Sequence, residues 1–484
     1  MVTHGDLRSV GIACDQGGAS ALGEIILNNV DNRLKTGVLK ETGTKVNKST
    51  ASRVIPLVAA VMLAACGGST STTGGLGTGP LLVGVLAPFS GADASFGPRY
   101  YAGCLAASLS INGAGGIGGR QVSCQQFDTR GEPADAVPAA NAMIASNSSS
   151  LMGVVGCTSD EAASVVQILD RSNIPMFCMT GQSQFNKTSY KYFHRLVPPD
   201  SFDAYAMIGS ALYGPNHAPY KNVALVFGDD IGSQTFVGPA VAALNKLGVK
   251  IAINQAIHLG AASYRTEVTK MLATNPDVIL TETIGSAGTY LGEVKTLNGG
   301  KMIPFIGTSA TIDPVWFQQV RDAIGLSDFL ANYTAVDLRL TLSGSGYDEF
   351  VKQLTAAVAT DPGALSYKGK SPTTHLYDGI IITALAMVAA NSSDPKVYNQ
   401  KIFDIANGVT GATVVGTYKE GVDAIHAGKS IRYVGAAGEN NFNEWNNSQQ
   451  GYNLVTMDKD ANEVTIGQLT QAQTQQIIDA GGNA

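Results

Sequence analysis

A repeated alternation of short apolar runs with helical segments constrains the fold of this chain more than any other feature. From residue 81 onward, strand candidates lie at 81–88, 122–128, 151–156 and 174–180, and segments with helical spacing separate them. Runs such as 81–88 and 151–156 are continuously apolar, which indicates strands that are covered on both faces. Because single helices separate the strands, the pattern predicts a parallel sheet built from right-handed crossovers.

The same pattern begins again at residue 222. Strand candidates lie at 222–227, 250–257, 277–283 and 302–308, with helical segments between them. The region after residue 80 has about four hundred residues, more than one hydrophobic core usually supports. The sequence therefore predicts an α/β fold with two doubly wound, parallel-sheet lobes.

The loops that follow the predicted strands are where function is expected. In open α/β sheets, ligands bind outside the carboxyl ends of the strands. The loops of interest are 89–98, 156–160, 180–186, 228–234, 283–287 and 308–313.

A short apolar segment, residues 54–65, precedes Cys66 and a stretch rich in Gly, Ser and Thr. A membrane-spanning helix needs roughly 20 apolar residues, so this segment fits a signal peptide better. Its end, LAAC, resembles the lipobox of bacterial lipoproteins, in which the cysteine becomes lipidated. We expect a leader and signal peptide in 1–65, lipidation at Cys66 and a flexible tether in 66–80. A short buried helix that ends at a cysteine is the alternative.

The composition excludes some classes of function. Charged residues make up 14% of the chain and hydrophobic residues 44%, and the formal net charge is −6. A chain without a basic stripe is a poor candidate for nucleic-acid binding. The apolar content also argues against a disordered chain.

The cysteines suggest an oxidising compartment. None of the six forms a CxxC pair, so zinc and thioredoxin-type sites are poor interpretations. Apart from the cysteine in the leader and Cys66, an even number remains in a chain that resembles an exported protein. The expected disulfides are Cys104–Cys124 and Cys157–Cys178, and buried free thiols are the alternative.

Motifs for catalysis and cofactor binding fail on inspection. Gly113 to Gly118 match the letters GxGxxG, but they follow a predicted helix and precede a predicted strand, so a turn is the better interpretation. No complete P-loop, nucleophile elbow or HExxH motif occurs. We expect no enzyme activity, no cofactor and no metal.

Three stretches resemble one family: LLVGVLAPFSGADASFGPRYYAG, YRTEVTKMLATNPDVIL and IRYVGAAGENNFNEWNN. They are similar to type I periplasmic binding proteins, especially the Leu/Ile/Val receptors of ABC importers, and the resemblance covers most of residues 81–460. It implies two lobes joined by three crossing segments, with the ligand in the cleft between them. The implied crossings lie near 198–199, 333–338 and 432–434, so that lobe 1 is 81–198 plus 337–432 and lobe 2 is 199–336 plus 433–484.

The resemblance also implies ligand contacts from lobe 1. Loops after the third and fourth strands supply hydroxyl and carbonyl groups that hold the carboxylate and ammonium of an amino acid, and an aromatic residue forms a wall. An ordinary loop hydrogen bond is the alternative for each of these residues. The matching positions here are Phe96, Thr158, Ser159, Thr180, Gln182 and Ser183.

Lobe 2 departs from the amino-acid pattern. Two expected tyrosines appear as Ile231 and Ile284, and the acid expected to face the ammonium appears as Ser309. An unpaired ammonium in a closed cleft costs on the order of several kcal/mol. Glu282 or Asp230 could replace that acid, so the ligand remains open among an amino acid, an amide and a small acid.

The resemblance implies a substrate-binding lipoprotein of an ABC importer. Such a protein closes around a small solute and delivers it to a membrane permease. We expect an extracytoplasmic, lipid-anchored monomer whose partners are a small-molecule ligand, the permease–ATPase complex and the membrane. A ligand sensor that signals to a membrane partner is the alternative, and a secreted enzyme is a third.

Overall fold

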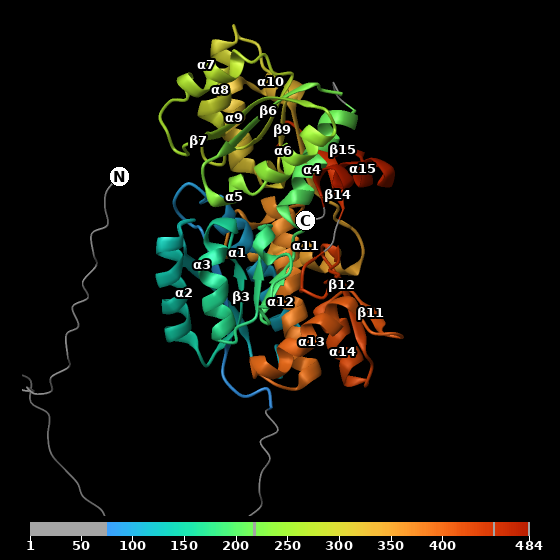
Figure 1. Cartoon of the computed structure of the whole chain (residues 1–484). Coiled ribbons are helices and arrows are strands. Elements are labelled where there is room, and N and C mark those ends of the chain that lie inside the picture. The colour runs from blue at the N-terminus through green and yellow to red at the C-terminus, as the bar shows by residue number, and fades with distance from the viewer. Residues whose placement is uncertain (1–74, 216–218, 449–450, 483–484) are drawn as a thin grey trace, which may run out of the picture. The chain divides into compact units, whose positions relative to one another are not determined.

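Two large sheets organise the part of the chain that the computed structural model describes, which comprises residues 75–215, 219–448 and 451–482. The expected leader, the signal peptide and Cys66 lie before residue 75, outside the described residues. We call the part around the first sheet lobe 1 and the part around the second sheet lobe 2 (Figure 1).

The sheet of lobe 1 is parallel throughout, with the order β2-β1-β3-β4-β5 in the described residues. Val83 and Val85 of β1 face one hydrophobic core, whereas Leu82 and Leu86 face another. Burial on both faces explains why the central strands β1 and β3 are continuously apolar, whereas the edge strand β2 is partly exposed and carries polar residues. The strands are β1 (Leu81–Ala87), β2 (Val122–Asp128), β3 (Leu151–Gly156), β4 (Met176–Cys178) and β5 (Phe193–Arg195).

Helices cover both faces of this sheet (Figure 1). The central one, α12 (Ser371–Ala390), is long and apolar enough to cross a membrane, but 89% of its apolar window is buried, so it is a core helix. It packs against α1 and α13. The helices of lobe 1 are α1 (Phe96–Gly113), α2 (Pro133–Asn147), α3 (Ser159–Arg171), α11 (Ser345–Ala357), α12, α13 (Pro395–Asn407) and α14 (Tyr418–His426), with the 3-10 turns η1 (Ser183–Phe185) and η3 (Ala364–Tyr367).

The sheet of lobe 2 has the order β15-β14-β10-β9-β8-β6-β7 in the described residues. Its pairs are parallel from β7 to β10, and β14 and β15 add an antiparallel edge. The strands are β6 (Asn222–Gly228), β7 (Lys250–Ile257), β8 (Val278–Glu282), β9 (Phe305–Gly307), β10 (Tyr333–Leu338), β14 (Tyr452–Met457) and β15 (Glu463–Gln468).

This sheet too lies between helices, and its two faces form separate hydrophobic cores. The first helix, α4, begins at Asp200, directly after the first passage between the lobes at Pro198 and Pro199. The helices are α4 (Asp200–Tyr213), α5 (Ile231–Gln234), α6 (Val237–Lys246), α7 (Arg265–Leu272), α8 (Ala287–Leu297), α9 (Pro314–Ile324), α10 (Leu326–Asn332) and α15 (Gln471–Gly481), with the 3-10 turn η2 (Ser309–Thr311).

The third passage lies later in the chain than the sequence suggested. Residues 433–448, assigned above to lobe 2, pack with lobe 1: Tyr433 and Phe442 belong to its core. The buried carboxylate of Asp378 on α12 accepts hydrogen bonds from the backbone N–H groups of Ala436 and Ala437. A small sheet of β11 (Thr413–Val415), β12 (Ile431–Gly435) and β13 (Gly438–Glu439) includes this segment. The expected crossing at 432–434 is therefore wrong, and the chain passes to lobe 2 between 448 and 452.

Both expected disulfides are present in lobe 1. Cys104–Cys124 joins α1 to β2, with the Cα atoms 6.1 Å apart. Cys157–Cys178 joins the residue after β3 to the end of β4, with the Cα atoms 5.0 Å apart. The second bond holds the loop after β3 against the neighbouring strand.

The GxGxxG stretch is a turn, as interpreted above. Helix α1 ends at Gly113, and an isolated bridge joins Ile117 to Arg120. Gly116 has a φ of +77°, and a Cβ there would lie 2.3 Å from the carbonyl oxygen of Arg120. Only glycine fits this turn.

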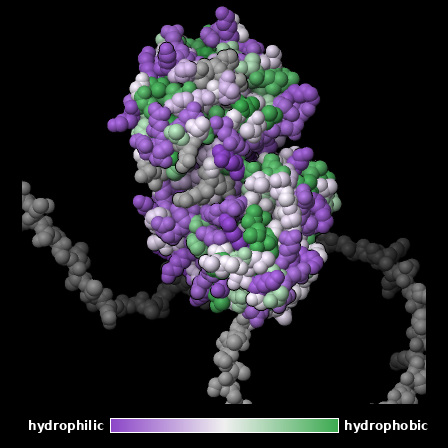
Figure 2. All heavy atoms as spheres, turned by 90° about the vertical axis from the view of Figure 1, so that its right-hand side faces the viewer, coloured by the Kyte–Doolittle hydropathy of each residue, from purple (hydrophilic) through white to green (hydrophobic). Residues whose placement is uncertain are grey.

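The face in Figure 2 shows hydrophobic residues in scattered patches among hydrophilic ones. Isolated apolar residues on a surface are normal for folded proteins. This face therefore gives no sign of a large apolar docking area.

Candidate ligand-binding cleft

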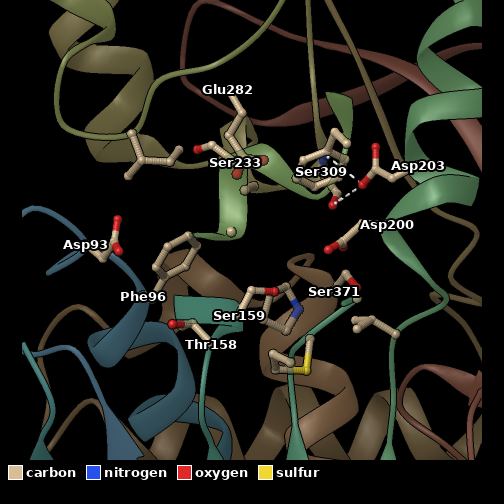
Figure 3. Close-up of a pocket in the computed structure, with 18 of the residues that line it drawn as sticks. Asp93, Phe96, Thr158, Ser159, Asp200, Asp203, Ser233, Glu282, Ser309 and Ser371 are labelled. Atoms are coloured by element: carbon tan, nitrogen blue, oxygen red, sulfur yellow. Dashed lines mark hydrogen bonds between the residues drawn. The ribbon is translucent and has the colours of Figure 1, made fainter. Parts of the chain in front are cut away.

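A cleft lies at the carboxyl ends of the parallel strands and is lined by residues of both lobes. The space between its walls, open mouth included, is about 840 Å³. Figure 3 shows the polar side chains that converge on it.

The short loop after β3 and the start of α3 supply the floor of the cleft from lobe 1. Thr158, Ser159 and Asp160 all line it. The buried carboxylate of Glu161 accepts hydrogen bonds from the backbone N–H and the hydroxyl of Thr158, which fixes the start of α3. The loop is thus held by this cap and by the disulfide at Cys157.

Thr180 and Gln182 support Ser159 from behind. The hydroxyls of Ser159 and Thr180 lie 3.1 Å apart, and Gln182 Nε2 donates to the carbonyl oxygen of Ser159 at 2.8 Å. Both supporting side chains are buried outside the lining, and Ser183 is exposed to solvent. Of these positions, the structure brings only Ser159 to the cleft.

The start of α1 forms an aromatic and cationic wall. Phe96 and Tyr100 stack with ring centroids 6.2 Å apart, and the Arg99 guanidinium lies 4.5 Å from the Phe96 centroid. Arg99 also pairs with Asp313 of lobe 2 at 3.5 Å. Both charged side chains are almost fully buried, so this ion pair links the lobes.

The start of α4 supplies two carboxylates that the sequence did not single out. Asp200 and Asp203 occupy the first turn of this helix and line the cleft. Thr235 Oγ1 donates to Asp200 Oδ2 at 2.5 Å, and Ser309 Oγ donates to Asp203 Oδ2 at 2.7 Å. The acid that seemed missing at Ser309 is thus present beside it, on a different element.

The loop after β6 approaches lobe 1 closely. Gly232 N–H donates to Asp160 Oδ1 across the cleft at 3.0 Å. A Cβ on Gly232 would lie 2.9 Å from Asp160 Oδ2, so glycine permits this approach. Asp230 caps α5 through Ser233 N at 2.6 Å and lines the cleft, whereas Ile231 is 48% exposed and lies outside the lining.

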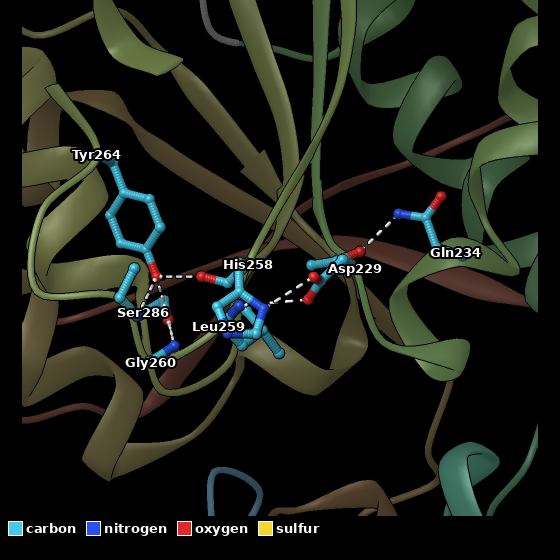
Figure 4. A network of polar contacts seen from close by, with 9 residues as sticks. Asp229, Gln234, His258, Leu259, Gly260, Tyr264 and Ser286 are labelled. Atoms are coloured by element: carbon cyan, nitrogen blue, oxygen red, sulfur yellow. Dashed lines mark hydrogen bonds and ion pairs between the residues drawn. The ribbon is translucent and has the colours of Figure 1, made fainter. Parts of the chain in front are cut away.

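A polar network fixes the neighbouring loops of lobe 2 (Figure 4). His258 Nδ1 lies 2.9 Å from Asp229 Oδ2, which ties the loop after β7 to the loop after β6. The Tyr264 hydroxyl lies 2.8 Å from both the His258 carbonyl oxygen and Ser286 Oγ. These bonds position the loops that carry Asp230 and Ile284.

The cleft is strongly acidic. Its lining contains seven carboxyl side chains and one guanidinium, that of Arg99. Five of the carboxyls come from lobe 2 and two from lobe 1. The acidic side chains are Asp93, Asp160, Asp200, Asp203, Asp230, Glu282 and Asp337.

Burial raises the pKa of several of these acids. The pKa rises to about 7 for Asp93, where Asp230 adds repulsion, and to about 8 for Asp160, where the repulsion again comes from Asp230. It rises to about 6 for Asp200 and to about 7 for Asp203, although hydroxyl donors partly offset the effect of burial. Burial also raises the pKa of Glu282 well above its usual range. A cation in the cleft would favour the ionised forms.

The cleft contains seven of the eleven ligand contacts expected from the sequence. These are Phe96, Thr158, Ser159, Asp230, Glu282, Ile284 and Ser309, and the four outside the lining are Thr180, Gln182, Ser183 and Ile231. The missed acids Asp200 and Asp203 follow the Pro-Pro pair of the first passage. That pair was a usable signal, because the chain enters lobe 2 there beside the cleft.

Two α/β lobes that share a cleft at the carboxyl ends of their strands define the class of two-lobed solute-binding proteins. The chain belongs to the periplasmic binding protein family, whose model matches residues 80–461. Members of this family bind solutes and are not enzymes, so the expectation of no enzyme activity is confirmed.

Known relatives agree with this class. An amino acid binding protein of Pseudomonas aeruginosa is 30% identical over 224 residues, which are 44% of this chain and 56% of that protein. This match therefore spans little more than half of the relative's length. A chemotactic signal transduction system substrate-binding protein, BasB of Halobacterium salinarum, is 24% identical over 371 residues, or 74% of this chain and 82% of that protein.

Solved structures show the same fold. The leucine-binding protein LivK of Thermotoga maritima superposes with a TM-score of 0.63 at 15% identity, covering 81% of this chain and 99% of that one. A solute-binding protein of an ABC transporter from R. palustris, in complex with benzoate, gives a TM-score of 0.61 at 17% identity and covers 80% and 96% of the two chains.

Proposed function

We propose that this chain is the substrate-binding lipoprotein of an ABC importer. It captures a small organic solute in the cleft by hinge closure and delivers it to a membrane permease. Names of relatives support this class: one binds amino acids, and a structural neighbour is an ABC transporter component with benzoate bound. The two disulfides fit an oxidising, extracytoplasmic compartment.

The main support for the proposal is that side chains and backbone of the two lobes contact each other across the cleft. Asp160 of lobe 1 accepts a hydrogen bond from Gly232 of lobe 2, and Arg99 pairs with Asp313. A solute that contacts both walls stabilises the closed arrangement, and a permease can recognise that arrangement.

The site also favours one kind of ligand group. Asp203, with Ser309 as its donor, supplies the carboxylate that an ammonium requires. Ser159 and Thr158 supply hydroxyls for a carboxylate or an amide. An amino acid or an amine therefore fits better than a simple aromatic acid, which would place an anion among carboxylates.

A solute screen tests the proposal. Thermal-shift measurements with amino acids, amines, amides and aromatic acids should find at least one compound that raises Tm, because a ligand of the folded state stabilises it. Small-angle scattering with that compound should report a more compact particle. Failure of every small solute to raise Tm would contradict the function.

Lipid attachment at Cys66 is the second part of the proposal. The apolar segment and LAAC support it, and mass spectrometry of membrane-extracted protein tests it. The mature chain should begin at a diacylated Cys66. Abundant soluble chain that retains residues 1–65 would contradict lipidation without touching the solute-binding function.

A sensor role is the second candidate. It is favoured by the match to BasB, which spans more of this chain than the match to the amino acid binding protein of P. aeruginosa. Genes for a permease and an ATPase beside this one would favour import. A neighbouring transducer gene would favour signalling.

A further inference from the structure

The carboxyl groups of the cleft fall into two groups. Asp93, Asp160 and Asp230 repel one another and form the first acidic group. Asp200 and Asp203 form the second acidic group. Figure 3 shows Asp93 on one side and the second group on the other, with Phe96 and Ser159 between them.

The cationic side chains near the cleft do not neutralise either acidic group. Arg99 is the one cationic side chain in the described lining, and its guanidinium already pairs with Asp313 and lies over Phe96. Arg195 interacts with Asp200 from behind, outside the lining, and donates to the carbonyl oxygen of Gln182. A ligand must therefore bring positive charge to both sides of the cleft.

Unused acceptors point the same way. Asp203 is 3% exposed, and its Oδ1 has no hydrogen-bond partner among the described residues. In the first group, Asp230 is half-buried, but its Oδ2 atom is also buried and has no hydrogen-bond partner among the described residues. A buried carboxylate oxygen without a donor is costly, so a donor from the ligand is expected at each place.

The acids are arranged for an organic cation, not for a metal ion. Within residues 75–215, 219–448 and 451–482, no group of three or more acidic, His or Cys side chains could hold a metal. Phe96 and Ser159 lie between the two groups (Figure 3), and Tyr452 also lines the cleft. An apolar linker between two charged ends would pack along these side chains.

We propose that the ligand carries two separated positive groups, as in a diamine or a basic amino acid. One ammonium or guanidinium lies at the first acidic group and the other at the second, while Glu282 lies within the field of both. This inference rests on the proposed solute-binding function and narrows its substrate class.

Matched pairs of compounds test this inference. Purified chain is unfolded and refolded without reductant to remove bound solute, then titrated calorimetrically with 1,5-diaminopentane, 1-aminopentane, lysine, norleucine and benzoate. Each dication should bind about tenfold or more tightly than the partner that lacks its second ammonium. Benzoate should bind most weakly.

Two variants locate the charges. Asp93→Asn and Asp203→Asn keep the side-chain shape, and each should reduce the advantage of the dication to less than about threefold. Asp322→Asn removes a carboxylate of lobe 2 that is 57% exposed and pairs with Arg321, so it should leave that advantage unchanged.

The possible outcomes test the dicationic ligand and the solute-binding function separately. Tight binding of norleucine or benzoate with no preference for dications would overturn this inference and leave the solute-binding function intact. A preference that survives in both Asn variants would also overturn it. Binding of no compound, here or in the wider screen, would overturn both.

Discussion

The two walls of the cleft draw their polar groups from different elements. Lobe 1 presents Thr158 and Ser159 from the capped start of α3, which follows the disulfide-bonded Cys157. Lobe 2 presents Asp200 and Asp203 from the first turn of a helix, and its strands and helices contain no cysteine. Lobe 1 thus combines these hydroxyl groups with only two of the seven acids, Asp93 and Asp160, whereas lobe 2 supplies the other five.

This difference suggests a division of work. The neutral groups of lobe 1 orient a ligand, because hydroxyls donate or accept as required. The carboxylates of lobe 2 provide most of the electrostatic attraction, because charge-assisted hydrogen bonds are the stronger ones. Closure then depends on contacts such as Asp160–Gly232 that join the walls.

The largest expected effect is on stability, through the brace of lobe 1. Cys157→Ala with Cys178→Ala should lower the free energy of unfolding by about 3 kcal/mol, because it opens a loop between residues 21 apart in sequence. It should also weaken solute binding, since Cys157 adjoins Thr158. Urea unfolding and calorimetry measure the two effects.

The other disulfide is the matched control. Cys104→Ala with Cys124→Ala opens a loop of similar length, with a separation of 20, so the loss of stability should be similar. Neither cysteine lines the cleft, so affinity should not change. Equal effects of the two pairs on affinity would show that the brace does not serve the site.

The next effect concerns the charge of lobe 2 and depends on pH. Asp203 has a folded pKa of about 7, raised by burial above its usual 3.8, so protonation favours the folded state. Its contribution to stability is present below about pH 4 and is lost as the pH rises through 7. From about pH 5 to about pH 7, the empty chain should lose on the order of 2 kcal/mol relative to Asp203→Asn.

Comparison with the Asn variant removes other titrations from this test. Burial lowers the pKa of His194 to about 4, so the contribution of His194 makes stability increase with pH, opposite to that of Asp203. Because His194 is present in both proteins, its effect cancels in the comparison. Asp200 and Ser309, which face Asp203, are also shared. Parallel pH profiles of the two proteins in urea unfolding would mean that Asp203 is ionised throughout.

The contact between the walls should show a smaller effect. Gly232→Ala places a Cβ against Asp160 Oδ2, so the closed form should be strained and affinity should fall about tenfold. Gly238→Ala is the control, because nothing lies within 4 Å of its Cβ position. Equal affinities of both variants in calorimetry would argue against this closed contact.

The smallest expected effect on affinity is that of the neutral hydroxyl groups of lobe 1. Ser159→Ala should weaken binding about fivefold, because one hydroxyl contact is lost, and it should leave Tm of the empty chain almost unchanged. Ser183→Ala alters an exposed hydroxyl of the following loop and serves as the control. A larger loss for Ser159→Ala than for Asp203→Asn would reverse the division of work between the lobes.

Much of the fold was predictable because both faces of the central parallel strands, such as β1 and β3, are buried. The alternation that places Val83 in one core and Leu82 in another appears in the sequence as an unbroken apolar run. The third passage was not predictable in this way. Tyr433 and Phe442 pack on helices that precede them, and local patterning carries no information about such distant contacts.

The two walls of the cleft also differ in how well the sequence predicts their site residues. Ser159 begins α3, a short step beyond the end of β3, where the rule for parallel sheets locates ligand groups. Asp203 lies on a helix after the first passage, and only the folded structure brings it to Ser309, 106 residues away. Thr180 and Gln182 satisfied the same rule but turned inward to support Ser159.

The central claim is that the carboxylates of the cleft hold the positive charge of a ligand. Asp93, Asp160, Asp200 and Asp203 have raised pKa values, and the charged groups around them are Asp230, Glu161, Glu132, Arg99 and Arg195. A bound cation lowers those pKa values, so binding near neutral pH must release protons.

Calorimetry in buffers of different ionisation enthalpy measures this proton exchange directly. With the compound that raises Tm most, the account predicts release of protons near pH 6.5 and an affinity that increases with pH. The release should diminish in Asp203→Asn. Uptake of protons, or an affinity that falls as the pH rises, would indicate an anionic ligand and would contradict the account.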